Sequence, residues 1–176
     1  GLVDQAREAL SAALDSARES GQRLDEGEIL HDLARCALLD DLPDLARDLA
    51  GQARVVCESL GADARSAAVE LLIARLDVRE GSNLDHALEI GRKWSHEVET
   101  SVDVIDAVLL RAEARLAQGN LDACAQELER VSEAGVGVST NGLGLLSNRL
   151  HELYLRARLA DAQQDDDAFS QAVVES

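Results

Sequence analysis

The chain has a single proline, Pro43, in 176 residues, and short polar breaks divide it into segments of similar length. Proline interrupts helices because it lacks a backbone N–H and clashes with the preceding turn, so little in this chain prevents helix formation. Between the breaks, apolar residues recur at spacings of three and four, as in Leu109, Ala112 and Leu116. That is the period of an amphipathic helix, and the pattern predicts an all-α fold.

The breaks also predict where the helices begin and end. Asp41 and Pro43 are typical of a helix start, because an aspartate can cap backbone N–H groups and proline fits the first turn. The nine predicted helices are 2–19, 23–39, 43–59, 62–79, 83–97, 102–118, 121–133, 141–163 and 166–175.

The apolar residues are mostly small. Hydrophobic residues make up 46% of the chain but aromatic residues only 2%, namely Trp94, Tyr154 and Phe169. A β-sandwich draws on more aromatic and β-branched residues, whereas alanine and leucine suit helices that approach closely. We expect Trp94 to lie in the core.

Four segments share one pattern: a small residue in a first helix, a polar turn, and a small residue about a dozen positions later. The segments are 33–46, 73–87, 111–124 and 156–169. Their small positions, called anchors here, pair as Ala34 with Ala46, Ala74 with Ala87, Ala112 with Cys124, and Ala157 with Phe169. We expect the first six of these residues to be buried where helices cross, because a larger side chain would push the helices apart.

The segment LAQGNLDA (116–123) resembles the tetratricopeptide repeat, in which a Gly-Asn turn joins two helices that carry small residues at their crossing. The resemblance implies a right-handed α-α superhelix of about four and a half antiparallel helix pairs. It also implies one repeat domain over residues 1–176 and a concave groove. Since the chain has no methionine and begins in mid-repeat, we expect it to be a piece of a longer protein.

The repeats are longer and more aliphatic than the basic tetratricopeptide unit, and in this they resemble the superhelical regions of bacterial regulators of the MalT kind and of signalling ATPases. That resemblance implies a non-catalytic module that binds a protein or peptide in its groove. The alternative is a spacer or dimerisation domain, which would form a homodimer through a terminal helix with Val173 and Val174 uncovered.

In such repeats, residues at two fixed offsets from the first anchor line the groove. The residues that follow the anchor are Arg35, Arg75, Glu113 and Arg158. The residues three positions before it are His31, Leu71, Leu109 and Tyr154. We expect the three arginines to bind acidic groups of a partner, with His31 and Tyr154 adding flat contacts. The alternative is that these arginines pair with neighbouring carboxylates on solvated faces.

Charge and residue inventory exclude several functions. The net charge of −17 predicts no nucleic-acid or membrane-surface binding, because it repels phosphate. The four histidines and three cysteines show no metal-ligand spacing, and no phosphate loop or nucleophile elbow occurs, so we expect no metal, no cofactor and no enzymatic activity. Three unpaired cysteines without a CxxC motif are typical of the reducing cytoplasm. The acids at 165–167 are interpreted as a helix cap.

Overall fold

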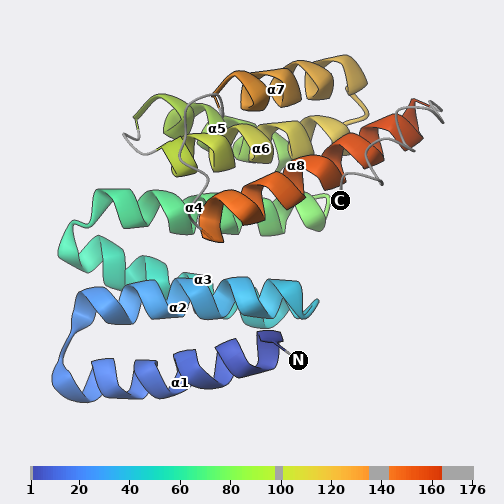
Figure 1. Ribbon diagram of the computed structural model, residues 1–176. Helices are drawn as coiled ribbons and strands as arrows, with labels where there is room; N and C mark the ends of the chain where they lie inside the picture. The colour runs from blue at the N-terminus through green and yellow to red at the C-terminus, as the bar shows by residue number, and fades with distance from the viewer. Residues whose placement is uncertain (1, 98–100, 135–142, 164–176) are drawn as a thin grey trace. The chain divides into compact units, whose positions relative to one another are not determined.

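The computed structural model describes residues 2–97, 101–134 and 143–163, and within these ranges every regular element is a helix (Figure 1). The helices are α1 (Leu2–Ser20), α2 (Arg23–Leu39), α3 (Pro43–Leu60), α4 (Asp63–Arg79), α5 (Leu84–Glu97), α6 (Ser101–Ala117), α7 (Leu121–Ala134) and α8 (Leu143–Ala162). Each begins and ends within two residues of its predicted position, which confirms the all-α prediction for these ranges. The ninth predicted helix, 166–175, lies outside them.

Five turns between these helices share one backbone geometry. Each has a residue in the left-handed conformation one or two positions after the end of the helix; these residues are Gly21, Asp41, Gly61, Gly81 and Gly119. At Gly61, for example, its N–H donates to the carbonyl of Glu58 (3.2 Å), and the N–H of Ala62 donates to the carbonyl of Cys57 (3.1 Å). This pair of bonds satisfies carbonyls that the end of a helix leaves without partners. The same two bonds recur at all five turns, so the same local structure is used each time.

The turn before α3 corrects one prediction. Asp41 does not cap the new helix: the N-cap residue is Leu42, and no side chain bonds to the helix start. Asp41 instead takes the left-handed conformation, with φ of 57°, that glycine takes at the other four turns. Aspartate visits this region more readily than most residues, because its short polar side chain can bond locally. Pro43 does occupy the first turn of α3, as predicted.

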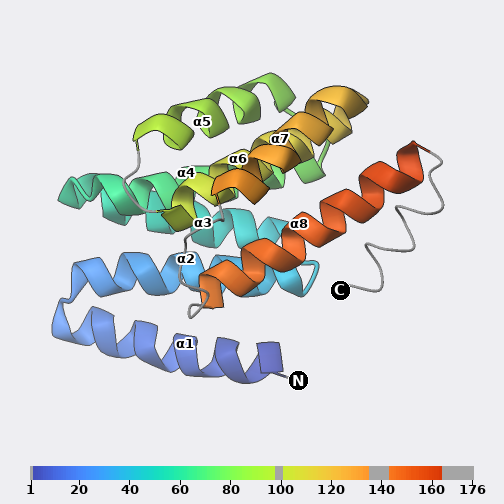
Figure 2. The same cartoon turned by 45° about the horizontal axis from the view of Figure 1, so that its top comes forward.

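Two compact units can be distinguished, unit 1 (Gly1–Leu76) and unit 2 (Asp77–Ser176), and each is described by itself. In unit 1, α1 contacts α2 and α2 contacts α3 (Figure 2). Small residues line the seam between α2 and α3: Ala37 packs with Ala46 and Leu76, and Ala34 packs with Ala50 and Leu72. Because residue numbers rise along one helix as they fall along the other, α2 and α3 are antiparallel.

In unit 2, α6 contacts α5, α7 and α8, and α8 also contacts α7. The core here has larger side chains around Ala112 and Cys124, including Leu109, Leu128 and Leu155. The close approach of α5 to α6 depends on Gly91, since a Cβ at that position would lie 2.5 Å from Cγ of Arg111. The helices of unit 2 therefore also pack mainly on their neighbours in sequence.

The six anchors expected at helix crossings are all buried, with exposed fractions of 2% or less; they are Ala34, Ala46, Ala74, Ala87, Ala112 and Cys124. Trp94 is buried too, as predicted. The fourth anchor pair ends at Phe169, outside the described ranges. The predicted burial of these six positions is therefore confirmed.

Candidate functional site

Three of the predicted groove residues belong to unit 1. His31 and Arg35 lie one turn apart on α2, and Arg75 lies on α4. His31 Nδ1 is 3.5 Å from Oδ1 of Asp32. The hydrogen bond with His31 lowers the pKa of Asp32, and the charge of Arg35 lowers it further, although partial burial opposes both. Arg35 is exposed and Arg75 half-buried, and their role in a groove stays a prediction.

The other two predicted residues, Tyr154 and Arg158, form a pair on α8 in unit 2. Arg158 Nη1 donates a hydrogen bond to the Tyr154 hydroxyl at 2.8 Å, and its guanidinium carbon lies 5.8 Å from the ring centroid. The Tyr154 side chain is 51% exposed. An exposed aromatic ring therefore holds an arginine in one orientation on the helix surface.

Two further residues of α8 extend this pair. Leu150, one turn before Tyr154, is also exposed. His151 lies beside Tyr154, with ring centroids 6.4 Å apart, and its Nε2 is 3.4 Å from Oε2 of Glu113 on α6. We call Leu150, His151, Tyr154 and Arg158 the α8 surface. The sequence analysis missed Leu150 and His151, although their positions three and four residues before Tyr154 would have placed them on the same face.

The α8 surface combines charge, aromatic area and apolar area. Within the part of the chain that the structure describes, the contacts of the Arg158 guanidinium are with Tyr154 and not with a carboxylate. Tyrosine and arginine are the residues that dominate binding energy at protein interfaces, and a guanidinium matches the geometry of a carboxylate. The arrangement suits a guest with an acidic group beside an apolar one.

Part of the predicted groove is wrong. Leu71 and Leu109, at the offset shared with His31 and Tyr154, are completely buried and cannot touch a ligand. At Leu109 the reason is that α6 is covered by three neighbouring helices, whereas among described residues α8 contacts only α6 and α7. Whether Arg35, Arg75 and Arg158 share one wall stays a prediction, because they belong to separate units.

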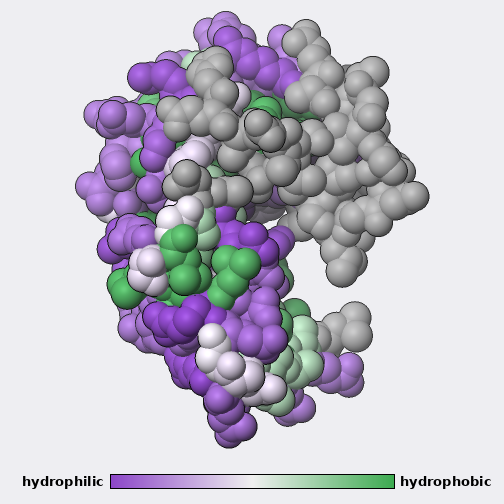
Figure 3. Space-filling view, turned by 90° about the vertical axis from the view of Figure 1, so that its left-hand side faces the viewer, coloured by the Kyte–Doolittle hydropathy of each residue, from purple (hydrophilic) through white to green (hydrophobic). Residues whose placement is uncertain are grey.

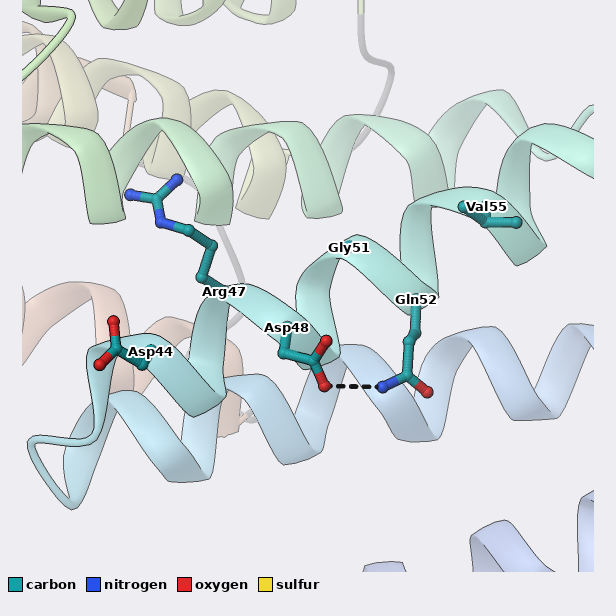
Figure 4. Close-up of a pocket in the computed structure, with 6 residues that line it drawn as sticks. All are labelled: Asp44, Arg47, Asp48, Gly51, Gln52 and Val55. Carbon is teal, nitrogen blue, oxygen red and sulfur yellow. Dashed lines mark hydrogen bonds between the residues drawn. The ribbon is translucent and has the colours of Figure 1, made fainter.

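A second surface was not predicted. An open groove of about 510 Å³ lies along α3 in unit 1, lined by Asp44, Arg47, Asp48, Gly51, Gln52 and Val55 (Figure 4). Asp48 accepts a hydrogen bond from the Gln52 amide at 3.0 Å, and Gln52 accepts one from Arg18 of α1 at 3.3 Å. The signal that could have revealed this groove is a glycine in the middle of a helix, where it weakens the helix unless something approaches closely.

The buried acids of the described residues have structural partners. Glu26 is held between Arg18 (3.0 Å) and Arg23 (2.6 Å), and Glu152 between Arg149 (2.9 Å) and Arg156 (2.8 Å). Glu127 is likewise paired with Arg111 and Arg130. A buried carboxylate needs such partners, so these ion pairs are explained by the fold alone.

The thiols have raised pKa values. Burial is the main cause for Cys36, Cys57 and Cys124, and it raises the pKa of Cys124 to about 11, with Glu127 adding to the effect and Arg156 opposing it. A thiol with such a pKa is protonated at neutral pH and is a poor nucleophile. In the described ranges no group of three or more histidine, cysteine or acidic side chains could hold a metal ion.

Apolar side chains reach the surface at several points. On the face drawn in Figure 3 they form small groups among hydrophilic ones. Around the turn between α2 and α3, Leu39 is 75% exposed, and Leu42 and Leu45 are exposed as well. None of the helices in the described ranges is long and apolar enough to cross a membrane.

Comparison with known proteins gives no relative for this chain. No protein-family model matches it, and neither a curated protein nor a solved structure is significantly similar to it. Its function has to be argued from its own residues.

Proposed function

We propose that this chain is a non-catalytic helical repeat module of the tetratricopeptide kind that binds a protein or peptide carrying acidic groups. The observation that carries the proposal is the Tyr154–Arg158 pair on α8, an exposed ring that orients a guanidinium without a carboxylate partner among described residues. His31, Arg35 and Arg75 are proposed to bind acidic groups of the partner in unit 1.

The repeat part of the proposal is supported by the turns. The left-handed residues of the first four turns lie at 21, 41, 61 and 81, so one helix and one turn take twenty residues each time. Repeat proteins build extended surfaces by stacking such identical units. The buried anchors are what close stacking of helices requires.

The chemistry of the α8 surface favours an acidic guest. A charge-assisted hydrogen bond contributes about 1.5–3 kcal/mol when partly desolvated, whereas an exposed ion pair contributes under about 1 kcal/mol. Among the described residues no carboxylate pairs with Arg158, and Leu150 and Tyr154 offer apolar area that can exclude water around the contact. The resemblance to bacterial regulators leads us to propose a regulatory or signalling partner in the cytoplasm.

The proposal is tested by affinity capture with the whole chain as bait. Partners recovered by the parent protein are identified by mass spectrometry and compared with those recovered by Arg158→Ala combined with Tyr154→Ala. The matched control is Arg92→Ala, since Arg92 is also exposed, lies in unit 2 and has no carboxylate partner within the described ranges. The proposal requires at least one partner protein that the parent and the Arg92→Ala control recover and the double variant does not. Equal recovery by all three baits would refute it.

A spacer or dimerisation domain is the second candidate. The apolar group at the turn between α2 and α3 favours it, because exposed leucines such as Leu39 gain by contact with another protein surface. Sedimentation of the parent and of Leu39→Glu tests the dimerisation form of this candidate: a dimer that Leu39→Glu dissociates supports dimerisation, and a monomer in both cases excludes it.

A further inference from the structure

The groove on α3 centres on a glycine that the fold does not require. Two other glycines inside helices have clear reasons: a Cβ at Gly27 would lie 3.1 Å from Cys57 Sγ, and one at Gly91 would lie 2.5 Å from Arg111. A Cβ at Gly51 would meet nothing within 4 Å. Glycine inside a helix is unfavourable by about 1 kcal/mol relative to alanine, so Gly51 weakens α3 without any contact that explains it.

The residues on either side of Gly51 give the groove a polar end and an apolar end. Asp44 and Asp48 lie in the first two turns of α3, and both are exposed. Asp44 has no hydrogen bond or ion pair within the described residues. Val55, one turn after Gly51, is 62% exposed. Arg47 is the one cation among the lining residues, and its side chain points away from Asp48 and Gln52 (Figure 4).

We infer that this groove is the docking site for a basic amphipathic helix of a partner protein. A lysine or arginine of the partner lies against Asp44 and Asp48, a small residue lies against Gly51, and an aliphatic side chain covers Val55. The bare backbone at Gly51 lets the partner helix approach closely, as Gly27 and Gly91 let helices approach within the chain. The inference does not depend on the α8 surface.

Charge complementarity selects this occupant over a second copy of the chain. The net charge of −17 attracts a basic partner over long distances and opposes association of two copies. Positions 44, 48, 51 and 55 follow one another at helical spacing, so they form a continuous stripe that a second helix can follow.

The test selects binders from a phage-displayed library of helical peptides randomised on one face, with the full chain as target. We expect the selected peptides to carry paired basic residues next to a small residue. Their affinity should fall by about tenfold or more with Gly51→Leu, and likewise with Asp44→Asn combined with Asp48→Asn. Arg158→Ala should leave their affinity unchanged, so failure here is distinct from failure of the proposed function.

Ala12→Leu is the matched control, because it adds the same side chain at an exposed position of α1 in the same unit. Gly51→Ala should raise the midpoint of thermal unfolding and also weaken peptide binding. If Gly51→Leu does not fold, Gly51→Ala replaces it in the binding test. Selected peptides that bind Gly51→Leu as tightly as the parent, or a library that yields no binder, would overturn the inference. A dimer that becomes monomeric in Gly51→Leu would also overturn it, because the occupant would then be a second copy.

Discussion

The helix pair α2–α3 of unit 1 and the pair α6–α7 of unit 2 meet through different side chains. In unit 1 alanines of both helices meet along part of the seam, with Ala34 and Ala50 at one level and Ala37 and Ala46 at the next. In unit 2 the small pair formed by Ala112 and Cys124 is surrounded by leucine, isoleucine and valine. Two helix pairs joined by the same kind of turn can therefore be sensitive to opposite substitutions. We expect the seam of unit 1 to be destabilised most by larger side chains, and the seam of unit 2 to be destabilised most by smaller ones.

The largest expected effect is a cavity in unit 2. Leu109 is fully buried in the cluster around Ala112, so Leu109→Ala should destabilise the protein by about 2–5 kcal/mol. Urea unfolding followed by the fluorescence of Trp94, the only tryptophan and itself in unit 2, measures the change. A loss below about 1 kcal/mol would show that the cluster collapses around the cavity and would remove the contrast between the two seams.

Added volume should affect unit 1 more than unit 2. Ala50→Leu and Ala112→Leu should each cost about 1–3 kcal/mol, because both positions are completely buried. Ala50→Leu should cost more, since Ala50 packs against Ala34, which has no side-chain rotamer to change, whereas Ala112 is surrounded by leucines that can change theirs. Far-UV circular dichroism in urea gives the two midpoints. Midpoints equal to that of the parent would mean that the crossings lie elsewhere.

Cys124 occupies the position in unit 2 that Ala46 occupies in unit 1, five residues after the left-handed residue of the turn. Burial raises its pKa to about 11 in the fold, so the unfolded chain ionises first as pH rises. The free energy of unfolding is therefore unaffected by this thiol below about pH 9 and falls progressively between about pH 9 and 11. The total loss is about 2–3 kcal/mol. Cys124→Ala should reduce this alkaline loss in urea titrations at several pH values. If Cys124→Ala shows the same decrease in stability at alkaline pH as the parent, other titrating groups cause that decrease.

The smallest expected effect concerns the turns, where Asp41 in unit 1 matches Gly119 in unit 2. Gly119→Ala should cost about 1–2 kcal/mol from the left-handed backbone alone, because no atom lies near the added Cβ. Asp41→Gly should stabilise by less than about 1 kcal/mol, since aspartate tolerates this conformation in part. Thermal unfolding of both variants provides the comparison. If the two substitutions shift the midpoint in the same direction, the turns are not equivalent.

The helix boundaries could be predicted because their determinants are local. Glycine after a helix, proline in a first turn and the spacing of apolar residues all act within a few residues. Asp41 was misassigned for a related reason: aspartate suits both a helix start and a left-handed turn, and the bond from Leu42 N–H to the Ala37 carbonyl decides between them. That choice is not visible in the residue types alone.

The candidate site could be predicted only in part. Tyr154 and Arg158 are four residues apart, so a helix must place them side by side, and the structure pairs them. Leu109 was misplaced because its burial depends on how many helices cover α6, which no local spacing records. The sequence holds one signal for the groove, a glycine inside the predicted helix 43–59, but the open space beside Gly51 depends on neighbours that only the fold defines.

The binding role of the α8 surface is tested most directly by mapping where a partner binds. The partner is the protein that the parent bait recovers and the Arg158→Ala, Tyr154→Ala variant does not. The isotope-labelled chain is titrated with this partner, and its backbone chemical shifts are followed by NMR. The account predicts that the largest changes fall on α8 around Tyr154 and Arg158, with the His151 ring among them. Changes confined to other helices, with α8 unaffected at saturation, would contradict it.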